Sequence, residues 1–211
     1  MKKTIEPKFI NDTTLRIGPV RLCYAHLNEP HNLPGTDPST AKYQTSFLVD
    51  KKDKKTIDAI NKAIEAAKQR GITSKNGKPT VWGTKIPDAS KLNIPLQDGD
   101  DRERGEDEFK GFMYINAKAN RKPVVVDKKC APILDPEEIY SGMWAVLVVS
   151  FFPYSNAGNK GVGCGLENVM KTSDGERFGG GALSPQAAFD DLDTSAFDDL
   201  DTSAFEDEED Y

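Results

Sequence analysis

Apolar and polar residues alternate along several short segments of this chain, and this period of two is typical of β-strands with one buried face. The alternating segments are residues 15–17 and 20–24, separated by Gly18-Pro19, and residues 43–49, 112–116 and 124–126. Residues 143–152 differ, because apolar side chains fill both alternating positions up to Pro153. This Val-rich and aromatic run predicts a long buried strand. The polar loop at 155–160 predicts a hairpin that returns along residues 161–170.

One segment shows the helical period instead. Its apolar residues recur every three or four positions, at Ile57, Ile60, Ile64 and Ala67. Asp53 can cap the first turn, and Lys68 and Arg70 suit the negative C-terminal end of the helix dipole. Gly71 then favours termination. The sequence therefore predicts a helix from Asp53 to about Arg70, followed by a loop-rich stretch up to Glu108.

Some five strands, one main helix and long loops predict a mainly β fold, and they suit a small five-stranded barrel of the OB-fold type. No run approaches the roughly 18 apolar residues of a membrane-spanning helix. The basic start of the chain lacks the apolar run of a signal peptide. Cys23, Cys130 and Cys164 lie far apart, which suits a reducing compartment rather than a disulfide framework. We therefore expect a cytoplasmic protein with no membrane partner.

Charge divides the 211-residue chain into two parts. The formal net charge is −6, but residues 186–211 contain eleven acids and no Lys or Arg, whereas residues 1–185 contain 28 bases and 23 acids. The acidic part repeats the unit FDDLDTSA, and Phe189, Phe197 and Phe205 recur at a period of eight. Each unit has too little apolar surface to offset the entropy of ordering. We predict a domain over residues 1–177, and a flexible linker with a disordered acidic tail over residues 178–211.

Few residues point to catalysis or to a metal site. His26 and His31 fall in a predicted loop without the HExxH spacing, and no CxxC pair accompanies them. The glycines of residues 158–165 lack the patterns of phosphate-binding loops and fit a tight turn and a closely packed strand. We predict no catalytic residue, no metal ligand and no cofactor. The main alternative is a nuclease that holds Mg²⁺ with the carboxylates between Asp98 and Glu108, although such mixed charges are typical of a solvated loop.

Basic and aromatic residues are interleaved in the body of the chain. Residues 42–91 contain twelve bases and five acids, and residues 109–130 contain six bases and one acid. Aromatic residues lie within or beside both segments: Tyr43, Phe47, Trp82, Phe112 and Tyr114. Single-stranded nucleic acid needs cations for its phosphates and rings on which its unpaired bases stack, so the combination favours sequence-independent binding of a single strand. The same aromatic residues can also fill a barrel core, and the pattern leaves both roles open.

Several stretches of the sequence resemble the phage-encoded single-stranded DNA-binding proteins. They include RLCYAHLNEP from Arg21, KYQTSFLVDK from Lys42, WGTKIP from Trp82, GFMYINA from Gly111 and FPYSNAGNKGVGCGLENVMK from Phe152. The resemblance covers nearly the whole body in chain order. It implies an OB-fold protein of phage replication and recombination, often dimeric, that coats exposed strands in the host cytoplasm. The family's acidic, aromatic-ended tail is matched by EDEEDY at Tyr211, although the repeats make this tail longer.

Three groups of residues are therefore candidates for function. The stacking candidates are Trp82, Tyr114 and Tyr154; the phosphate-contact candidates are Lys85, Lys118, Arg121, Lys122 and Lys160; and the candidates for docking partner proteins are Phe189, Phe197, Phe205 and Tyr211. We expect the tail to fold back into a basic groove and compete with DNA. Once released, it would recruit phage or host replication proteins, such as a polymerase, a helicase or primase, or a recombinase.

Two further alternatives concern the tail. In the first, the tail only raises solubility. In the second, the chain is a protein-only interaction module that uses its acidic tail to bind basic proteins and ignores DNA. The basic body argues against the second alternative, because such a module has no use for positive charge behind its acidic face.

Overall fold

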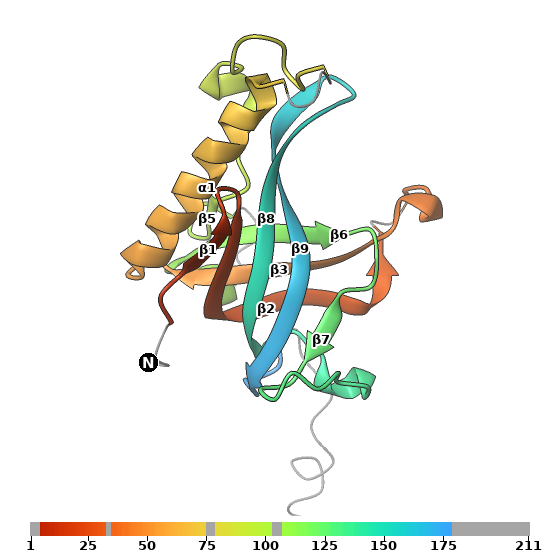
Figure 1. Ribbon diagram of the computed structural model, residues 1–211. Coiled ribbons are helices and arrows are strands. Elements are labelled where there is room, and N and C mark those ends of the chain that lie inside the picture. Colours follow the sequence, from red (N-terminus) through yellow and green to blue (C-terminus); the bar gives the residue numbers. More distant parts are fainter. Residues whose placement is uncertain (1–4, 33–34, 75–78, 103–106, 179–211) are drawn as a thin grey trace, which may run out of the picture. The chain divides into compact units, whose positions relative to one another are not determined.

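The computed structural model describes residues 5–32, 35–74, 79–102 and 107–178 (Figure 1). They belong to a unit of the chain that runs from Met1 to Gly179. The acidic repeats, and all of the predicted linker except Phe178, lie outside the described residues. The guanidinium carbon of Arg21 lies 4.0 Å from the ring centroid of Phe178, whose amide donates to the carbonyl of Ser141. The packed body therefore reaches one residue past the predicted boundary.

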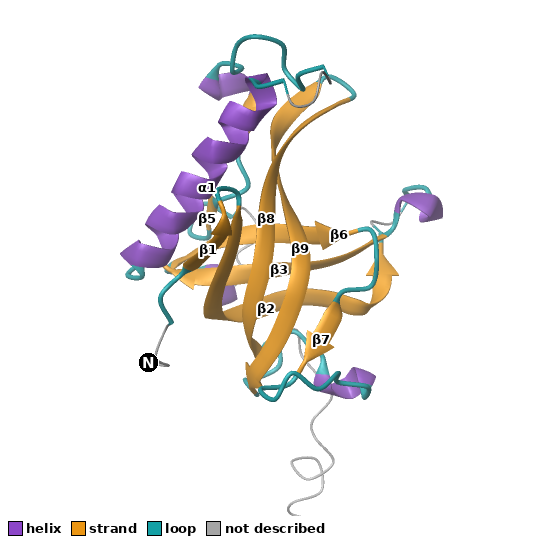
Figure 2. Ribbon diagram, in the orientation of Figure 1, coloured by secondary structure: helices purple, strands orange, loops and turns teal. Residues whose placement is uncertain are grey.

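Pairing of five strands closes a barrel, whose strands cross one another in Figures 1 and 2. β2 (Thr14–His31) pairs antiparallel with β8 (Trp144–Asn156) and with β3 (Lys42–Asp50). β3 continues the sheet to β6 (Phe112–Ala119), and β8 continues it to β9 (Asn159–Ser173). A parallel bridge between Lys118 of β6 and Gly165 of β9 closes the ring. The predicted mainly β, OB-fold-like barrel with one main helix is confirmed.

Shorter elements flank the barrel. The short strands, each paired with a barrel strand, are β1 (Lys8–Asn11), β4 (Leu92–Asn93), β5 (Gln97–Asp98) and β7 (Val124–Val126). Single 3₁₀ turns lie at Pro38–Thr40, Ala89–Lys91, Asp107–Phe109 and Pro136–Glu138. The loop-rich stretch predicted after the helix is present. Among the described residues, no helix combines the length and the apolar character needed to cross a membrane.

The helix α1 (Lys54–Ile72) lies against the barrel and completes its core (Figure 2). As predicted, Asp53 caps it, because its carboxylate accepts a hydrogen bond of 3.1 Å from the amide of Thr56. Its buried face follows the predicted period at Ile60, Ile64 and Ala67. These side chains belong to the same apolar cluster as the inward residues of the strands. The period of the sequence thus determines which face of the helix meets the sheet.

The helix does not stop at Gly71, as the sequence predicts, but includes it and ends at Ile72. A Cβ atom at Gly71 would come 2.4 Å from Cε3 of Trp82. The glycine is therefore needed for close packing of an indole ring against the last helical turn, and its role as a helix terminator is wrong. The amide of Trp82 also donates to the carbonyl of Gly71 at 3.0 Å, which ties the following loop to the helix.

β8 is longer than predicted, because it continues through Pro153. Buried residues alternate with more exposed ones along it, which confirms a strand. The amide of Phe151 donates to the carbonyl of Thr13 on the β2 side, and by the period of two the nitrogen of Pro153 faces the same side. Pairing with β2 ends at Ser150, so proline removes no hydrogen bond of the ladder. The strand then enters the predicted hairpin with β9.

β2 unites the two predicted half-strands and extends further than the sequence indicates. The interruption at Gly18-Pro19 is a register shift within one strand, between Ile17 and Val20. Beyond it, His26 and His31 pair with residues of β3, so the prediction that both histidines lie in a loop is wrong. This end of β2 lacks apolar alternation, and pairing with β3 rather than local pattern makes it a strand.

Candidate nucleic-acid interface

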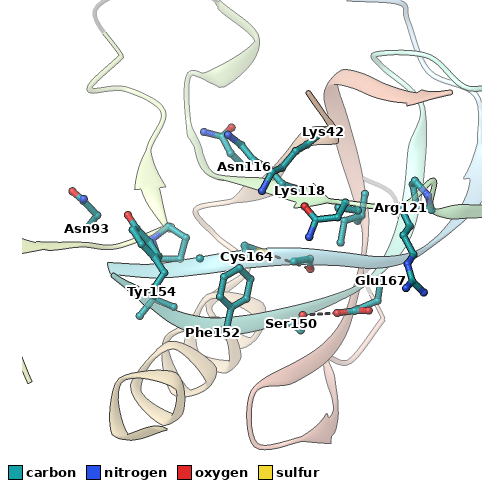
Figure 3. Close-up of a pocket in the computed structure, with 18 of the residues that line it drawn as sticks. Lys42, Asn93, Asn116, Lys118, Arg121, Ser150, Phe152, Tyr154, Cys164 and Glu167 are labelled. Carbon is teal, nitrogen blue, oxygen red and sulfur yellow. Dashed lines mark hydrogen bonds between the residues drawn. The ribbon is translucent and has the colours of Figure 1, made fainter. Parts of the chain in front are cut away.

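An open groove of about 780 Å³ lies where β6, β8 and β9 meet (Figure 3). Its floor comes from the outward side chains of β8, which alternate with the buried Val149 and Phe151. The turn after β6 and the start of β7 form one wall, and the segment around β4 forms another. The groove is therefore built from segments far apart in the sequence, which the closure of the barrel brings together.

Alternate glycines of β9 leave room for the side chains of the floor. Gly161, Gly163 and Gly165 stand opposite Tyr154, Phe152 and Ser150 of β8. A Cβ atom at Gly163 would come 2.7 Å from Cζ of Phe152, and one at Gly161 would come 2.8 Å from the Tyr154 hydroxyl. Both rings thus extend across β9 instead of standing between β9 side chains (Figure 3). The glycine-rich segment therefore allows close packing within a strand, as the sequence predicts.

Positive charge predominates around the groove. Four cationic side chains line it: Lys42, Lys118, Arg121 and Lys122. Among the described residues, none of the four forms an ion pair with a carboxylate. The one acid in the lining, Glu167, accepts a hydrogen bond of 2.6 Å from the Ser150 hydroxyl. Cations without a neighbouring carboxylate attract anions such as the phosphates of a nucleic acid.

The groove brings together half of the predicted contact residues. Tyr154 lines it, together with three of the five predicted cations, Lys118, Arg121 and Lys122. Lys160 lies at the start of β9, beside the groove but outside its lining, and Lys85 is exposed elsewhere. The contact roles of all these residues stay predictions. The tail residues Phe189, Phe197, Phe205 and Tyr211 lie outside the described residues.

Two of the predicted stacking residues are buried, which corrects their assignment. Trp82 is 7% exposed, and its indole nitrogen donates a hydrogen bond of 2.9 Å to the carbonyl of Tyr154. Tyr114 is 8% exposed, packs edge-to-face on Phe109, and donates its hydroxyl hydrogen to Gln97. Neither ring has a face open to a base. Their polar atoms explain why both aromatics tolerate burial: each has a hydrogen-bond partner.

Phe152 is the aromatic residue of the groove that the sequence prediction omits. Its side chain is 45% exposed, although it ends the most apolar run of the chain. The omission follows from treating both faces of that run as buried. The period of two nevertheless indicates that Phe152 is exposed, since it shares a face with Ser150 and Tyr154, which are polar or amphipathic.

The acidic loop after β5 is organised by a lysine. Lys51 Nζ contacts the carboxylates of both Asp98 and Asp100, and Asp100 also accepts from the amide of Gly111. The hydrogen bonds from Lys51 hold the pKa of both carboxyls below the ordinary value of 3.8. Among the described residues, no group of three or more His, Cys, Asp or Glu side chains could hold a metal ion. Lys51 therefore offsets part of the negative charge of Asp98 and Asp100.

Comparisons with known proteins agree with one another. Residues 13–200 match the family model described as Enterobacter phage Enc34, ssDNA-binding protein. A protein of Acyrthosiphon pisum secondary endosymbiont phage 1, named putative protein p50, is 31% identical over 188 residues, which cover 84% of this chain and 93% of that protein. The solved structure of the single-stranded DNA-binding protein from bacteriophage Enc34 in complex with ssDNA is 25% identical, with a TM-score of 0.65, over 85% of this chain and 100% of that chain. A C-terminal truncation of the phage Enc34 protein has the same fold, with a TM-score of 0.63 at 23% identity over 84% of this chain and 99% of that chain.

Proposed function

Because this chain belongs to the family of the Enterobacter phage Enc34 single-stranded DNA-binding protein, we propose that it binds single-stranded DNA in the groove between β6, β8 and β9, independently of sequence. The observation that carries the proposal is the juxtaposition in one groove of two partly exposed rings, Phe152 and Tyr154, with four cations. Members of this family bind DNA and are not enzymes, so the nuclease alternative is set aside.

Two kinds of contact would hold the strand. Lys42, Lys118, Arg121 and Lys122 would neutralise phosphates and release counterions, so that affinity falls steeply with salt. Phe152 and Tyr154 would stack on unpaired bases, each contact contributing about 1–3 kcal/mol. Side chains two residues apart on a strand are about 6.6 Å apart, so each ring can take its own base. Every base has a π-face, and the binding would therefore be indifferent to sequence.

In the cell, the protein would coat single strands as a homodimer during phage DNA replication and recombination in the host cytoplasm. The eleven acids of residues 186–211 support a further role for the tail. A tail of this charge would compete with DNA for the cationic groove and, once displaced, present its Phe residues and Tyr211 to phage or host replication proteins. Such partners would have basic, apolar pockets.

The test of this function is a titration of a fluorescent single-stranded oligonucleotide at low and moderate salt. The full chain is compared with a version that ends at Pro185 and with Phe152→Ala, and a duplex of the same sequence is the control. We expect a preference for the single strand, a loss of about tenfold with Phe152→Ala, and tighter binding after truncation.

The outcomes separate the parts of the proposal. If neither the full nor the truncated chain binds the single strand, the function is refuted. If both bind with equal affinity, DNA binding stands and the tail does not compete. If Phe152→Ala binds as tightly as the original chain, the strand does not stack on this ring and the groove is the wrong surface.

A further inference from the structure

The two histidines of the chain form a stacked pair near the end of β2. The ring centroids of His26 and His31 lie 3.9 Å apart, and the ring planes are inclined by only 8°. The His26 side chain is half-buried, whereas that of His31 is exposed. Among the described residues, neither imidazole has a hydrogen-bond partner. One ring thus supports another whose outer face is open to solvent.

Strand register connects this pair to the groove. One row of cross-strand partners runs around the barrel through His26, Gln44, Lys118, Gly165 and Ser150. Cross-strand partners in antiparallel pairs project on the same face of the sheet. The last three residues of this row line the groove. Neighbouring strands are about 4.8 Å apart, so His26 lies about two strand spacings, or roughly 10 Å, beyond Lys118.

A second register contact places the exposed ring even closer to the groove. His31 pairs directly with Lys42 of β3, and Lys42 is one of the four cations of the groove. The backbone of His31 therefore lies one strand spacing, about 4.8 Å, from that of Lys42. If single-stranded DNA leaves the groove across β3, one of its phosphates would lie near Lys42. The next base would then reach the histidine pair.

We propose that the His26–His31 pair is a stacking platform that extends the DNA-binding surface across β3 and takes one additional base on the outer face of His31. The inference rests on the function proposed above. His31 provides the contact surface, and His26 acts as a positioning residue that holds His31 flat. Burial, and secondarily the charge of His31, lower the pKa of His26. An uncharged His26 ring favours stacking on bases over binding of phosphates near neutral pH.

The test uses the full chain and fluorescein-labelled oligothymidylates of increasing length, from about 4 to about 16 nucleotides, the range of site sizes of OB folds. The variants are His31→Ala, His31→Phe and His26→Ala. Phe9→Ala removes an exposed ring from β1, outside the groove lining, and is the matched control. Thermal unfolding of each variant establishes that it is folded.

We expect His31→Ala to bind the shortest oligonucleotides as the original chain does and the longer ones about tenfold more weakly. His31→Phe should restore the affinity for the long oligonucleotides, because a phenyl ring also stacks. His26→Ala should cause a smaller loss than His31→Ala, and Phe9→Ala no loss.

Other results would overturn the proposal. Equal affinity of His31→Ala and the original chain at every length would show that no base reaches the pair. An equal loss at all lengths would place the effect of His31 in the groove itself. Failure of His31→Phe to restore affinity would exclude stacking. In all three cases the original chain still binds DNA, whereas absence of binding at any length refutes the proposed function itself.

Discussion

The ring of Phe152 occupies the space that a side chain at Gly163 would need. The two residues are cross-strand partners in β8 and β9, and a Cβ atom at Gly163 would come within 2.8 Å of both Cε2 and Cζ of the ring. The absence of a side chain on β9 therefore determines where an aromatic ring of β8 lies. This relationship links a glycine of β9 to the orientation of a ring that can stack on bases.

Replacement of Gly163 should weaken DNA binding only because it displaces the ring of Phe152. In Gly163→Ala the new methyl group would push the ring out of its position, and we expect a several-fold loss of affinity with an unchanged dependence on salt, because no cation is altered. Gly165→Ala is the matched control, since its Cβ would meet the Ser150 hydroxyl at 2.7 Å and the ring only at 3.6 Å.

A double-mutant cycle decides whether the effect passes through the ring. In a Phe152→Ala background, Gly163→Ala should cause no further loss of affinity. Titration of a labelled single strand at three salt concentrations measures both the affinity and the slope. An additional loss of the same size in the Phe152→Ala background would contradict the assignment, because Gly163 would then act by another route.

The cations of the groove should control the salt dependence. Lys118 lines the groove and has no carboxylate partner among the described residues. Lys118→Ala should therefore reduce the slope of log K against log salt by about 0.7, the amount expected for one lost phosphate contact to a single strand. Lys85→Ala, which changes an exposed lysine outside the groove lining, should leave the slope unchanged. Equal slopes for both variants would remove Lys118 from the interface.

The sequence predicts the elements of this fold better than their ends. The periods of two and of 3.6 correctly place the five barrel strands and the helix, because each follows from which side chains are buried, but they miss the short strands β1, β4 and β5. The ends depend on contacts between distant segments. The helix passes Gly71 because Trp82 packs there, and β8 passes Pro153 because β2 no longer pairs with it at that point. Neither contact is visible in a local pattern.

The sequence predicts which types of residue form the candidate site, but not which individual aromatic residues belong to it. Interleaved bases and aromatics indicate binding of a single strand, and Lys118, Arg121, Lys122 and Tyr154 do lie together. An aromatic residue in a basic segment, however, has the same local sequence whether it is buried or exposed. Closure of the barrel decides between the two, burying Trp82 and Tyr114 and exposing Phe152.

The acidic loop should stabilise the fold in a pH-dependent way. Lys51 contacts Asp98 and Asp100, and its hydrogen bonds lower the pKa of both carboxyls below 3.8. A carboxyl with a lowered pKa in the folded state stabilises the fold above its unfolded pKa, and this contribution is lost as pH falls through the folded pKa. We expect Lys51→Ala to be less stable than the original chain at pH 7, with the difference vanishing as the pH falls from about 4 to below the folded pKa.

Urea denaturation between pH 7 and pH 2.5 measures this difference. Lys52→Ala removes the neighbouring exposed lysine, which forms no ion pair among the described residues, and serves as the control. It should change stability little at any pH. A Lys51→Ala deficit that is as large at pH 3 as at pH 7 would show that the lysine stabilises the loop through its packing and not through its charge.

Trp82 and Tyr154 should separate stability from binding, although the sequence treats them alike. Trp82 is buried against Gly71 and donates to the carbonyl of Tyr154. Trp82→Leu should therefore lower the free energy of unfolding by about 2–3 kcal/mol and leave the affinity of the folded protein for DNA nearly unchanged. Tyr154→Leu should have the opposite effect, with a several-fold loss of affinity and little loss of stability, because its ring lies at the surface of the groove.

Denaturant unfolding measures the stability of both variants, and oligonucleotide titration measures their affinity for DNA. If Trp82→Leu instead lost affinity without losing stability, the indole would contact DNA and its assignment to the core would be wrong.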